Sequence, residues 1–251
     1  MTTRKAAGVS GPLHGKDHAL PAERQTAQGV VPVITVDGPG GSGKGTVSRY
    51  LADTLGWHFL DSGALYRLLA CAALRDQVPL DDEAGLAALA GRIRGEFLHT
   101  SSGEEQVLLD GEDVTPSLRT EACGNSASRL AALPQVRRAL LDWQRRYRQP
   151  PGLIADGRDM GTVVFPDARL KIFLTANAEE RARRRFNQLK NIGKYVKLGE
   201  VLEEIRRRDR RDSTRTTAPL IPADDAVIID NSDLDIAGTL QIVLDRARRV
   251  V

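Results

Sequence analysis

Cysteine, aromatic residues and long apolar runs are all scarce in this chain of 251 residues. Its two cysteines, Cys71 and Cys123, cannot form a disulfide framework, and neither has a second Cys or a His at metal-ligand spacing. No stretch approaches the roughly 20 apolar residues of a membrane-spanning helix. With 4% aromatics, the chain also lacks the interleaved aromatic and basic residues of single-strand nucleic-acid binders. These absences predict a soluble protein of a reducing cytoplasm.

The rest of the composition is ordinary for a globular protein, with 41% hydrophobic and 27% charged residues. The length favours one large domain, or one domain that carries insertions. Arg4 and Lys5 are followed by Gly, Pro, His and charged residues rather than by an apolar segment, so no secretory signal is expected. We therefore expect residues 1–30 to be a flexible extension and residues 31–251 to form the folded domain.

The charge is unevenly distributed along the chain. The net charge is only +3, but residues 181–215 hold thirteen Lys and Arg against five Asp and Glu, a local balance of +8 that leaves −5 for the remainder. Such a segment indicates an anionic partner. The sign alone does not choose among nucleic acid, a membrane surface and nucleotide phosphates.

Strand and helix patterns alternate along most of the chain. β-Branched runs indicate buried parallel strands, and segments with apolar residues three or four positions apart indicate helices. We expect strands at 31–36, 57–60, 153–155, 170–174 and 226–229. We expect helices at 46–55, 64–75, about 115–130, about 134–148, within 178–214 and at the C-terminus. This alternation predicts an α/β fold with a parallel core sheet flanked by helices.

The pattern changes after Arg94. Residues 96–100 and 105–110 predict an antiparallel hairpin, and Asp110-Gly111 predicts a second tight turn. We interpret this region as a small antiparallel β unit inserted into the α/β domain.

A glycine-rich loop, residues 38–46, lies directly between the first expected strand and the first helix. Its glycines allow backbone N–H groups to wrap closely around phosphate, and the N-terminus of the following helix adds a favourable dipole. Lys44 would reach the terminal phosphates. A strict phosphate loop has Ser or Thr directly after the Lys, whereas here Gly45 intervenes and displaces Thr46 by one position.

The same loop also satisfies the dinucleotide-binding fingerprint G-x-G-x-x-G through Gly38, Gly40 and Gly43. Asp61 ends the second strand about where that fold has its ribose-binding carboxylate. Against this interpretation, a dinucleotide fold has no use for a Lys at position 44. A nicotinamide-dependent oxidoreductase is therefore one alternative enzyme, and a small P-loop kinase that acts on another acceptor is the other.

Arginines dominate the basic segment. They begin one charged helix at 181–185 and recur at 206–215, with Gly193 and Gly199 between. This arrangement predicts two helices joined by a mobile loop, as in a lid that closes over a triphosphate. Guanidinium groups bind phosphate with two hydrogen bonds and can stabilise the charge on a phosphoryl group during its transfer. The alternatives are a solvated helix face, or a platform for RNA or DNA with a regulatory nucleotide site.

Two polar clusters stand out by their spacing. Arg208, Asp212 and Arg215 lie at i, i+4 and i+7, which predicts one shared helix face. Residues 156–159, Asp-Gly-Arg-Asp, follow a buried strand. They are therefore expected at the carboxyl edge of the sheet, where ligands bind in this architecture.

Four motifs make the sequence resemble the bacterial cytidylate kinases over about 31–251. They are GPGGSGKGT at 38–46, LDSGALYR at 60–67, GLIADGRDMGTVVFPDA at 152–168 and RDRRDSTR at 208–215. The resemblance implies a P-loop nucleoside monophosphate kinase fold, with an inserted monophosphate-binding unit at about 90–130 and a helical lid at about 181–200. It also implies ATP-dependent phosphorylation of CMP and dCMP to CDP and dCDP. The transfer would be direct and in line, without a covalent enzyme intermediate, and Mg²⁺ would be carried mainly by the nucleotide.

The resemblance also implies which residues form the binding and catalytic sites. The ATP loop would comprise Gly38, Pro39, Gly40, Gly41, Ser42, Gly43, Lys44, Gly45 and Thr46. The CMP site would comprise Ser62, Tyr66, Arg67, Ser128, Arg137, Arg158, Asp159, Arg208, Asp212 and Arg215. The implied catalytic residues are Lys44, Arg158, Asp159, Arg181 and Arg185. No metal-ligating residues are assigned.

The implied CMP-site residues divide by role. Arg67, Arg158 and Arg208 would hold phosphate, Tyr66 and Asp212 the sugar, and Ser128, Arg137 and Asp159 the base. Cytosine offers an amino donor to a carboxylate and acceptors at N3 and O2 to the other two base contacts. Uracil reverses two of these polarities and would leave buried groups unpaired.

The implied partners are the small molecules CMP, dCMP and ATP, with no nucleic acid and no membrane. Small kinases of this form need no partner chain, so we expect a monomer. Cys71 lies in an apolar helix, where we expect a buried and inert thiol.

Overall fold

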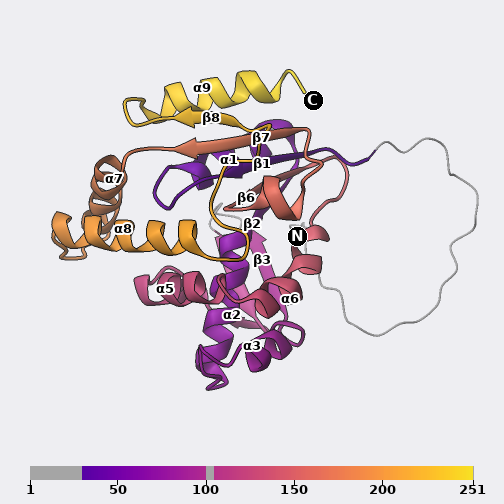
Figure 1. The fold of residues 1–251 in the computed structure, drawn as a ribbon, viewed down its shortest axis with the longest axis vertical. Coiled ribbons are helices and arrows are strands. Elements are labelled where there is room, and N and C mark those ends of the chain that lie inside the picture. The colour runs from indigo at the N-terminus through magenta and orange to yellow at the C-terminus, as the bar shows by residue number, and fades with distance from the viewer. Residues whose placement is uncertain (1–29, 100–104, 251) are drawn as a thin grey trace, which may run out of the picture.

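A five-stranded parallel sheet forms the centre of the structure, a computed structural model that describes residues 30–99 and 105–250 (Figure 1). Its strands are β1 (Val33–Asp37), β2 (His58–Asp61), β6 (Leu153–Gly157), β7 (Leu170–Thr175) and β8 (Val227–Asp230), in the order β2-β6-β1-β7-β8. The predicted parallel sheet is therefore confirmed. The expected extension at 1–30 lies, except for Val30, outside the described residues.

The central strands are buried on both faces. Every residue of β1 and of β6 is buried, which is the pattern of parallel strands covered by helices on both sides. Val36 of β1 lies in register between Asp156 of β6 and Ile172 of β7. The carboxyl ends of these strands therefore meet at one edge of the sheet, where polar residues begin.

Helices pack against the sheet through separate apolar clusters. α1 (Lys44–Leu55) and α9 (Ile236–Ala247) bury Leu51 and Val243 against Ile34 of β1. Another cluster contains Met160 and Phe165 beside the short π-helix η1 (Met160–Val164). The sequence patterns do not predict η1.

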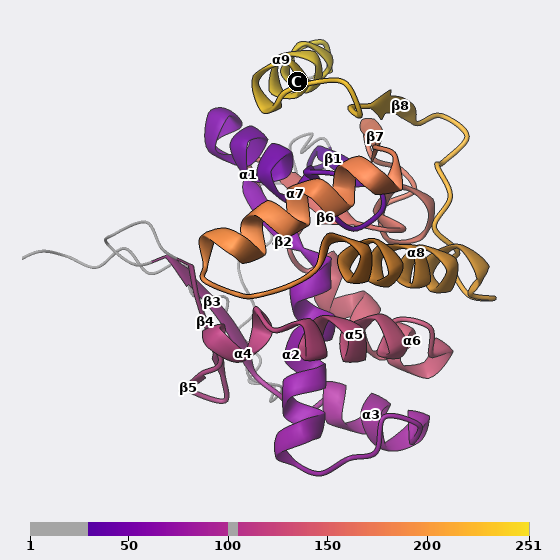
Figure 2. The same ribbon diagram turned by 90° about the vertical axis from the view of Figure 1, so that its left-hand side faces the viewer.

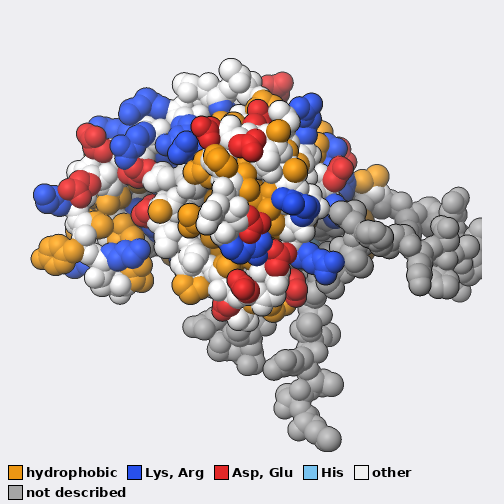
Figure 3. Space-filling model, turned by 90° about the horizontal axis from the view of Figure 1, so that it is seen from below, with side chains coloured by type: hydrophobic (Ala, Val, Ile, Leu, Met, Phe, Trp, Pro, Cys, Tyr) orange, Lys and Arg blue, Asp and Glu red, His pale blue; other side chains and the backbone are white. Residues whose placement is uncertain are grey.

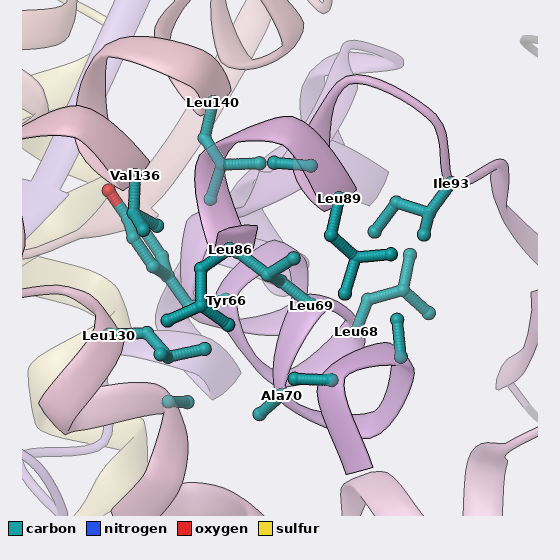
Figure 4. Packing of buried hydrophobic residues seen from close by; sticks show 14 of the residues in the cluster. Tyr66, Leu68, Leu69, Ala70, Leu86, Leu89, Ile93, Leu130, Val136 and Leu140 are labelled. Carbon is teal, nitrogen blue, oxygen red and sulfur yellow. The ribbon is translucent and has the colours of Figure 1, made fainter. Parts of the chain in front are cut away.

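A second packed unit lies below the sheet in Figure 1. Its helices are α2 (Ser62–Arg75), α3 (Glu83–Ala90), α4 (Thr115–Leu118), α5 (Glu121–Leu130) and α6 (Pro134–Arg145). Its antiparallel strands are β3 (Gly95–His99), β4 (Glu105–Leu109) and β5 (Glu112–Asp113). Fully buried Leu69, Leu86 and Leu130 surround Tyr66 in a core of its own, which Figure 4 shows.

The turn predicted at Asp110-Gly111 joins β4 to β5. Both residues have positive φ, 50° and 90°, as a tight two-residue hairpin turn requires. The β3–β4 hairpin is also confirmed, although the turn itself lies outside the described residues.

The helices of this unit differ from the expectation in two ways. The helix expected over about 115–130 is two helices, because the Thr120 backbone is extended and its hydroxyl caps α5 by accepting from the Cys123 N–H. The helix α3 is not predicted at all, although Asp82 caps it by accepting from the Gly85 N–H at 2.9 Å.

The two charged helices predicted in the basic segment are confirmed as α7 (Ala178–Asn191) and α8 (Leu198–Thr214). They pack on each other through Leu189 and Val201 and project from the sheet above α5, as Figure 2 shows. Gly199 lies inside α8 rather than between the helices. None of the helices among residues 30–99 and 105–250 is long and apolar enough to cross a membrane.

The shared helix face predicted for three residues of the basic segment is correct for only two of them. Arg208 and Asp212 lie one turn apart on α8, but Arg215 follows the end of the helix with φ −62° and ψ 139°. Its backbone is therefore extended.

The two cysteines, which are 52 positions apart in the sequence, meet between α2 and α5. The Sγ atoms of Cys71 and Cys123 are 3.6 Å apart. Cys71 is half-buried rather than buried, so that expectation is wrong.

Candidate active site

The glycine-rich loop connects β1 to α1, as predicted. Gly41 and Gly43 have φ of 80° and 90°, a conformation that side chains rarely tolerate. A Cβ at Gly38 would lie 2.0 Å from the carbonyl oxygen of Leu174, so only glycine fits beside β7. The loop ends at Lys44, the first residue of α1. The unpaired N–H groups of that first helical turn make it a natural phosphate site.

Lys44 is buried against this loop. Its Nζ donates to the carbonyl oxygen of Pro39 at 3.2 Å and lies 4.0 Å from Oδ1 of Asp156. Burial, reinforced by the charge of Arg158, lowers the pKa of Lys44 to about 7, and burial raises the pKa of Asp156 to about 6. An anion placed beside Lys44 would favour its charged form.

One cavity of about 340 Å³ opens beside the loop and is lined by Gly41, Gly43, Lys44, Gly45 and Thr46. All ten residues predicted for the monophosphate site also line it: Ser62, Tyr66, Arg67, Ser128, Arg137, Arg158, Asp159, Arg208, Asp212 and Arg215. These residues come from α2, α5, α6, α8 and two connecting segments. The tertiary fold thus brings the ten residues predicted for the monophosphate site together with the end of the glycine-rich loop.

Asp212 is the centre of one polar cluster in this cavity. It accepts hydrogen bonds from Nε of Arg158 and Oγ of Ser128, both at 3.1 Å, and lies 3.9 Å from Nε of Arg208. Burial alone would raise the pKa of Asp212, but the neighbouring guanidinium groups hold it below its ordinary value. The buried Nε of Arg208 has no hydrogen-bond partner, so this cluster retains a donor for an anion.

Asp159 is the centre of a second cluster. Arg137 donates to its Oδ2, and Nη2 of Arg215 lies 3.7 Å from its Oδ1. Both guanidinium groups also donate to the carbonyl oxygen of Ala131, at 3.2 and 3.3 Å. Nearby, burial raises the pKa of Tyr66 to about 12. This cluster offers fixed donors and acceptors in a buried setting, which suits recognition of a planar polar ring.

The two predicted lid arginines occupy different environments. Arg181 is only 5% exposed, donates to the carbonyl oxygen of Gly40 at 3.1 Å and binds Asp209 through both terminal nitrogens. Arg185 pairs with Glu121 of α5 and lines a neighbouring cavity of about 860 Å³. Arg181 therefore contacts the phosphate loop, whereas Arg185 connects α7 to α5 of the second packed unit.

Strand order decides against the dinucleotide-binding alternative. In that fold the ribose-binding carboxylate ends the strand next to the first one, but here β6 separates β1 from β2. Asp61 instead caps α2 by accepting from the Ala64 N–H at 3.1 Å, and it lies 3.7 Å from Arg67.

Comparison with known proteins agrees with this geometry. A sequence model of the family described as cytidylate kinase matches residues 34–249. The chain belongs to the cytidylate kinase family. It is 57% identical over 213 residues to a cytidylate kinase of Colwellia psychrerythraea strain 34H, covering 85% of this chain and 94% of that protein. It is 59% identical over 215 residues to a cytidylate kinase of Stutzerimonas stutzeri strain A1501, with coverage of 85% and 94%.

The cytidylate kinase family confirms the resemblance that the four motifs indicated. The parallel sheet, the loop at its edge and the separate antiparallel unit agree with the predicted P-loop kinase fold. The roles assigned to individual site residues stay predictions.

Two buried carboxylates near the loop were not among the predicted site residues of this cytidylate kinase family member. Asp37 accepts from the N–H groups of Met160 and Gly161 at 2.9 and 2.8 Å, and burial raises its pKa to about 7. Asp156, described above with Lys44, is the other. Asp37 ends β1 directly before the glycine-rich loop, and Asp156 begins the 156–159 cluster at the carboxyl edge of the sheet, so both had a local signal.

Two further residues outside the predicted site support the loop, Asn231 directly and Asp209 through Arg181. Asn231, which is buried, donates from Nδ2 to the carbonyl oxygen of Ser42 at 3.0 Å and accepts from Arg184. Asp209 holds Arg181, as described above. Asp209 lies in the 208–215 motif, but only the tertiary contacts show the partners of the two residues, because both lie far from the loop in the sequence.

Proposed function

We propose that this protein transfers the γ-phosphoryl group of ATP to CMP and dCMP, forming CDP and dCDP. The observation that carries the proposal is the single cavity that joins Lys44 of the phosphate loop to the clusters around Asp159 and Asp212. A phosphate donor and an anionic acceptor could therefore meet there. The names of the curated relatives, cytidylate kinases, support CMP as the acceptor.

The loop from Gly38 to Thr46 would hold the phosphates of ATP. Its backbone N–H groups would surround the phosphate oxygens, and Lys44 would contact the terminal phosphates as a positive charge. The buried contact between Asn231 and Ser42 supports this role, because it fixes the loop against α7 and β8.

The acceptor would lie across the two polar clusters. Arg67, Arg158 and Arg208 would bind its phosphate, which fits the unpartnered donor on Arg208. Asp212 and Tyr66 would contact the sugar. The Arg158–Asp212 hydrogen bond would then link phosphate recognition to sugar recognition.

The base would contact the cluster around Asp159. The carboxylate would accept from the cytosine amino group, while Arg137 and Ser128 would donate to N3 and O2. Because Arg137 and Arg215 pair with Asp159, the carboxylate oxygens of Asp159 are held in a fixed position. We therefore assign Asp159 to base recognition and orientation of the acceptor.

The transfer itself would be in line and without a covalent enzyme intermediate. An acceptor phosphate oxygen is already nucleophilic at neutral pH, so the protein mainly positions two anions and stabilises the moving charge. Arg181, which already contacts Gly40 of the loop, and Arg185 would approach that charge as α7 and α8 close over the cavity. The lid would then comprise about 181–200, and the monophosphate unit about 90–130.

Mg²⁺ would accompany ATP, mainly on its phosphates. The Thr46 hydroxyl and the Asp156 carboxylate line the same cavity and are oxygen ligands of the kind that Mg²⁺ prefers. Residues 30–99 and 105–250 contain no group of three or more His, Cys, Asp or Glu side chains that could hold a metal ion. The ion would neutralise charge on the β- and γ-phosphates.

A nucleic-acid platform is less well supported. Many arginines of the basic segment form ion pairs with nearby acids: Arg181 with Asp209, Arg183 and Arg184 with Glu180, Arg206 with Glu179, and Arg207 with Glu204. On the face in Figure 3, acidic and basic side chains are interspersed. Such pairing weakens the potential that a phosphate backbone needs. We accordingly propose a cytoplasmic monomer that acts on small molecules.

A coupled assay of ADP release tests the proposal. It offers CMP, dCMP, UMP, AMP and GMP in turn, with ATP and Mg²⁺. We expect fast turnover of CMP and dCMP and slow turnover of UMP. Activity should collapse in Lys44→Ala but not in Lys190→Ala, which removes an exposed lysine of α7. Binding of ATP without phosphorylation of any monophosphate would contradict the proposal.

A further inference from the structure

The cysteine pair between α2 and α5 has no part in the proposed reaction. Both cysteines are free thiols, and their Sγ atoms lie 3.6 Å apart. Cys71 is half-buried and can be reached from solvent, whereas Cys123 is 8% exposed. Two thiols that meet from distant parts of a chain form a site with chemistry of its own, because an oxidant can join sulfur atoms that lie this close when the side chains reach the geometry of a disulfide.

The surroundings of the pair divide the roles of the two thiols. A hydrogen bond from Cys123 lowers the pKa of Cys71. The same interaction and burial raise the pKa of Cys123. Cys71 is therefore the thiol with more thiolate character, which is the form that reacts with oxidants. Cys123 lies within reach to resolve the first product.

We propose that Cys71 and Cys123 form a reversible disulfide when the protein meets a peroxide. The Cys71 thiolate attacks a peroxide oxygen, so that an S–O bond forms, the O–O bond breaks and hydroxide leaves. Cys123 then attacks the Cys71 sulfenic acid, forming the S–S bond and releasing water. Two thiols lose two electrons in total, and the peroxide, with their two protons, is reduced to two waters.

The geometry requires only a small local change. An S–S bond is about 2.05 Å long, so the two sulfur atoms must approach each other by about 1.5 Å. Rotation of the side chains supplies part of this distance, and a shift of α2 toward α5 supplies the rest. A dithiol in excess reverses the bond by thiol–disulfide exchange.

The link would act on acceptor binding, a step of the inference that rests on the proposed function. Cys71 follows Arg67 by one helical turn, and Sγ of Cys123 lies 3.5 Å from the Arg67 carbonyl oxygen. Oxidation ties α2, which carries Arg67, to α5, which carries Ser128. The phosphate loop connects β1 to α1 and is not part of either of the helices that the disulfide would join. We therefore expect weaker CMP binding with unchanged ATP binding.

Mass spectrometry of the full chain tests the disulfide independently of activity. After treatment with hydrogen peroxide, the wild type should lose two hydrogen atoms in mass and both titratable thiols, with a Cys71–Cys123 peptide in the digest. Dithiothreitol should restore both thiols. Cys71→Ser and Cys123→Ser should show no such loss of hydrogen. A wild type that keeps both thiols, or that only gains oxygen atoms or forms covalent dimers, would overturn the inference.

Kinetics of the same oxidised sample test the consequence. The KM for CMP should rise on oxidation by about tenfold or more, within the roughly 10²-fold that a misplacement of 1 Å can cost, while the KM for ATP stays within about twofold. Dithiothreitol should reverse the rise, and peroxide should not produce it in Cys123→Ser. An unchanged KM for CMP in fully disulfide-linked protein would overturn the regulatory part. If reduced protein phosphorylates no monophosphate, the proposed function fails while the mass result still supports the disulfide.

Discussion

The ammonium group of Lys44 lies 4.0 Å from the carboxylate of Asp156, and both side chains are almost fully enclosed between the phosphate loop and β6. Burial brings the pKa of the lysine down to about 7 and that of the aspartic acid up to about 6. Burial thus disfavours the charged forms of both groups, and an anion bound at the loop would stabilise the ammonium form of Lys44. We therefore expect a large share of the lysine to be neutral at pH 8 when no anion is bound.

ATP binding at pH 8 should therefore take up protons. Triphosphate beside Lys44 favours the ammonium form and returns its pKa toward the ordinary value of about 10.4. We expect an uptake approaching one proton per bound ATP, measured by titration calorimetry in buffers of different ionisation enthalpy. The uptake should vanish in Lys44→Met and persist in Lys190→Met. Equal uptake by wild type and Lys44→Met would contradict the assignment.

Arg181 and Arg183 lie on the same helix but should differ in their effect on turnover. Arg181 is buried at the loop, whereas the side chain of Arg183 is 68% exposed. We expect Arg181→Gln to lower kcat by about 10²–10³-fold, the usual effect of removing one donor to a transition state. Arg183→Gln should stay within about twofold. Steady-state kinetics with CMP and ATP measure both, and similar losses in the two variants would argue against a role for Arg181 in transfer.

Asp159 should set the preference between cytosine and uracil. In Asp159→Asn the amide can donate to the O4 oxygen of uracil, so the penalty against UMP is reduced. We expect the ratio of kcat/KM for CMP over UMP to fall by about 10–100-fold, which corresponds to one or two buried hydrogen bonds. Asp167→Asn, at a half-exposed ion pair with Arg148, is the matched control. A ratio that does not change would place the base elsewhere.

Asp37 should make stability depend on pH. Its pKa is raised from 3.8 to about 7, chiefly by burial. Between these values the native protein binds more protons than the unfolded chain, so the contribution of Asp37 falls as pH rises. The free energy of unfolding of wild type relative to Asp37→Asn should thus decrease by up to about 4 kcal/mol from pH 4 to pH 7.

Urea denaturation at a series of pH values measures this difference. The exposed Asp224→Asn is the control, and it should show no change of that size. A constant difference between wild type and Asp37→Asn would mean that the carboxyl keeps an ordinary pKa.

The sequence predicted features whose signals are local. The loop before Lys44 is recognisable because glycine spacing, a preceding β-branched strand and a following helix all lie within about twenty residues. The turn at Asp110-Gly111 is recognisable because few residues tolerate positive φ. By contrast, the break at Thr120 depends on a single cap within an otherwise helical pattern. Arg215 depends on where α8 ends, which periodicity locates poorly.

The ten monophosphate-site residues show a second limit. The family resemblance grouped them. Only the fold shows that Ser128 donates to Asp212 and Arg137 to Asp159, because those partners are 84 and 22 positions apart in the sequence. The contact of Asn231 with the loop has no local pattern, and the 208–215 motif does not show that Asp209 pairs with Arg181, which is 28 positions away.

The sequence by itself determined the strands of the central sheet, most of the helices, the phosphate loop and the family of this protein, because these depend on side-chain periodicity and on residues close together in the chain. Tertiary structure alone decided that β6 separates β1 from β2, that Asp156 faces Lys44, and that Cys71 meets Cys123. Each of these contacts results from the joint packing of distant elements around shared apolar cores, and such packing leaves no signal in the local sequence.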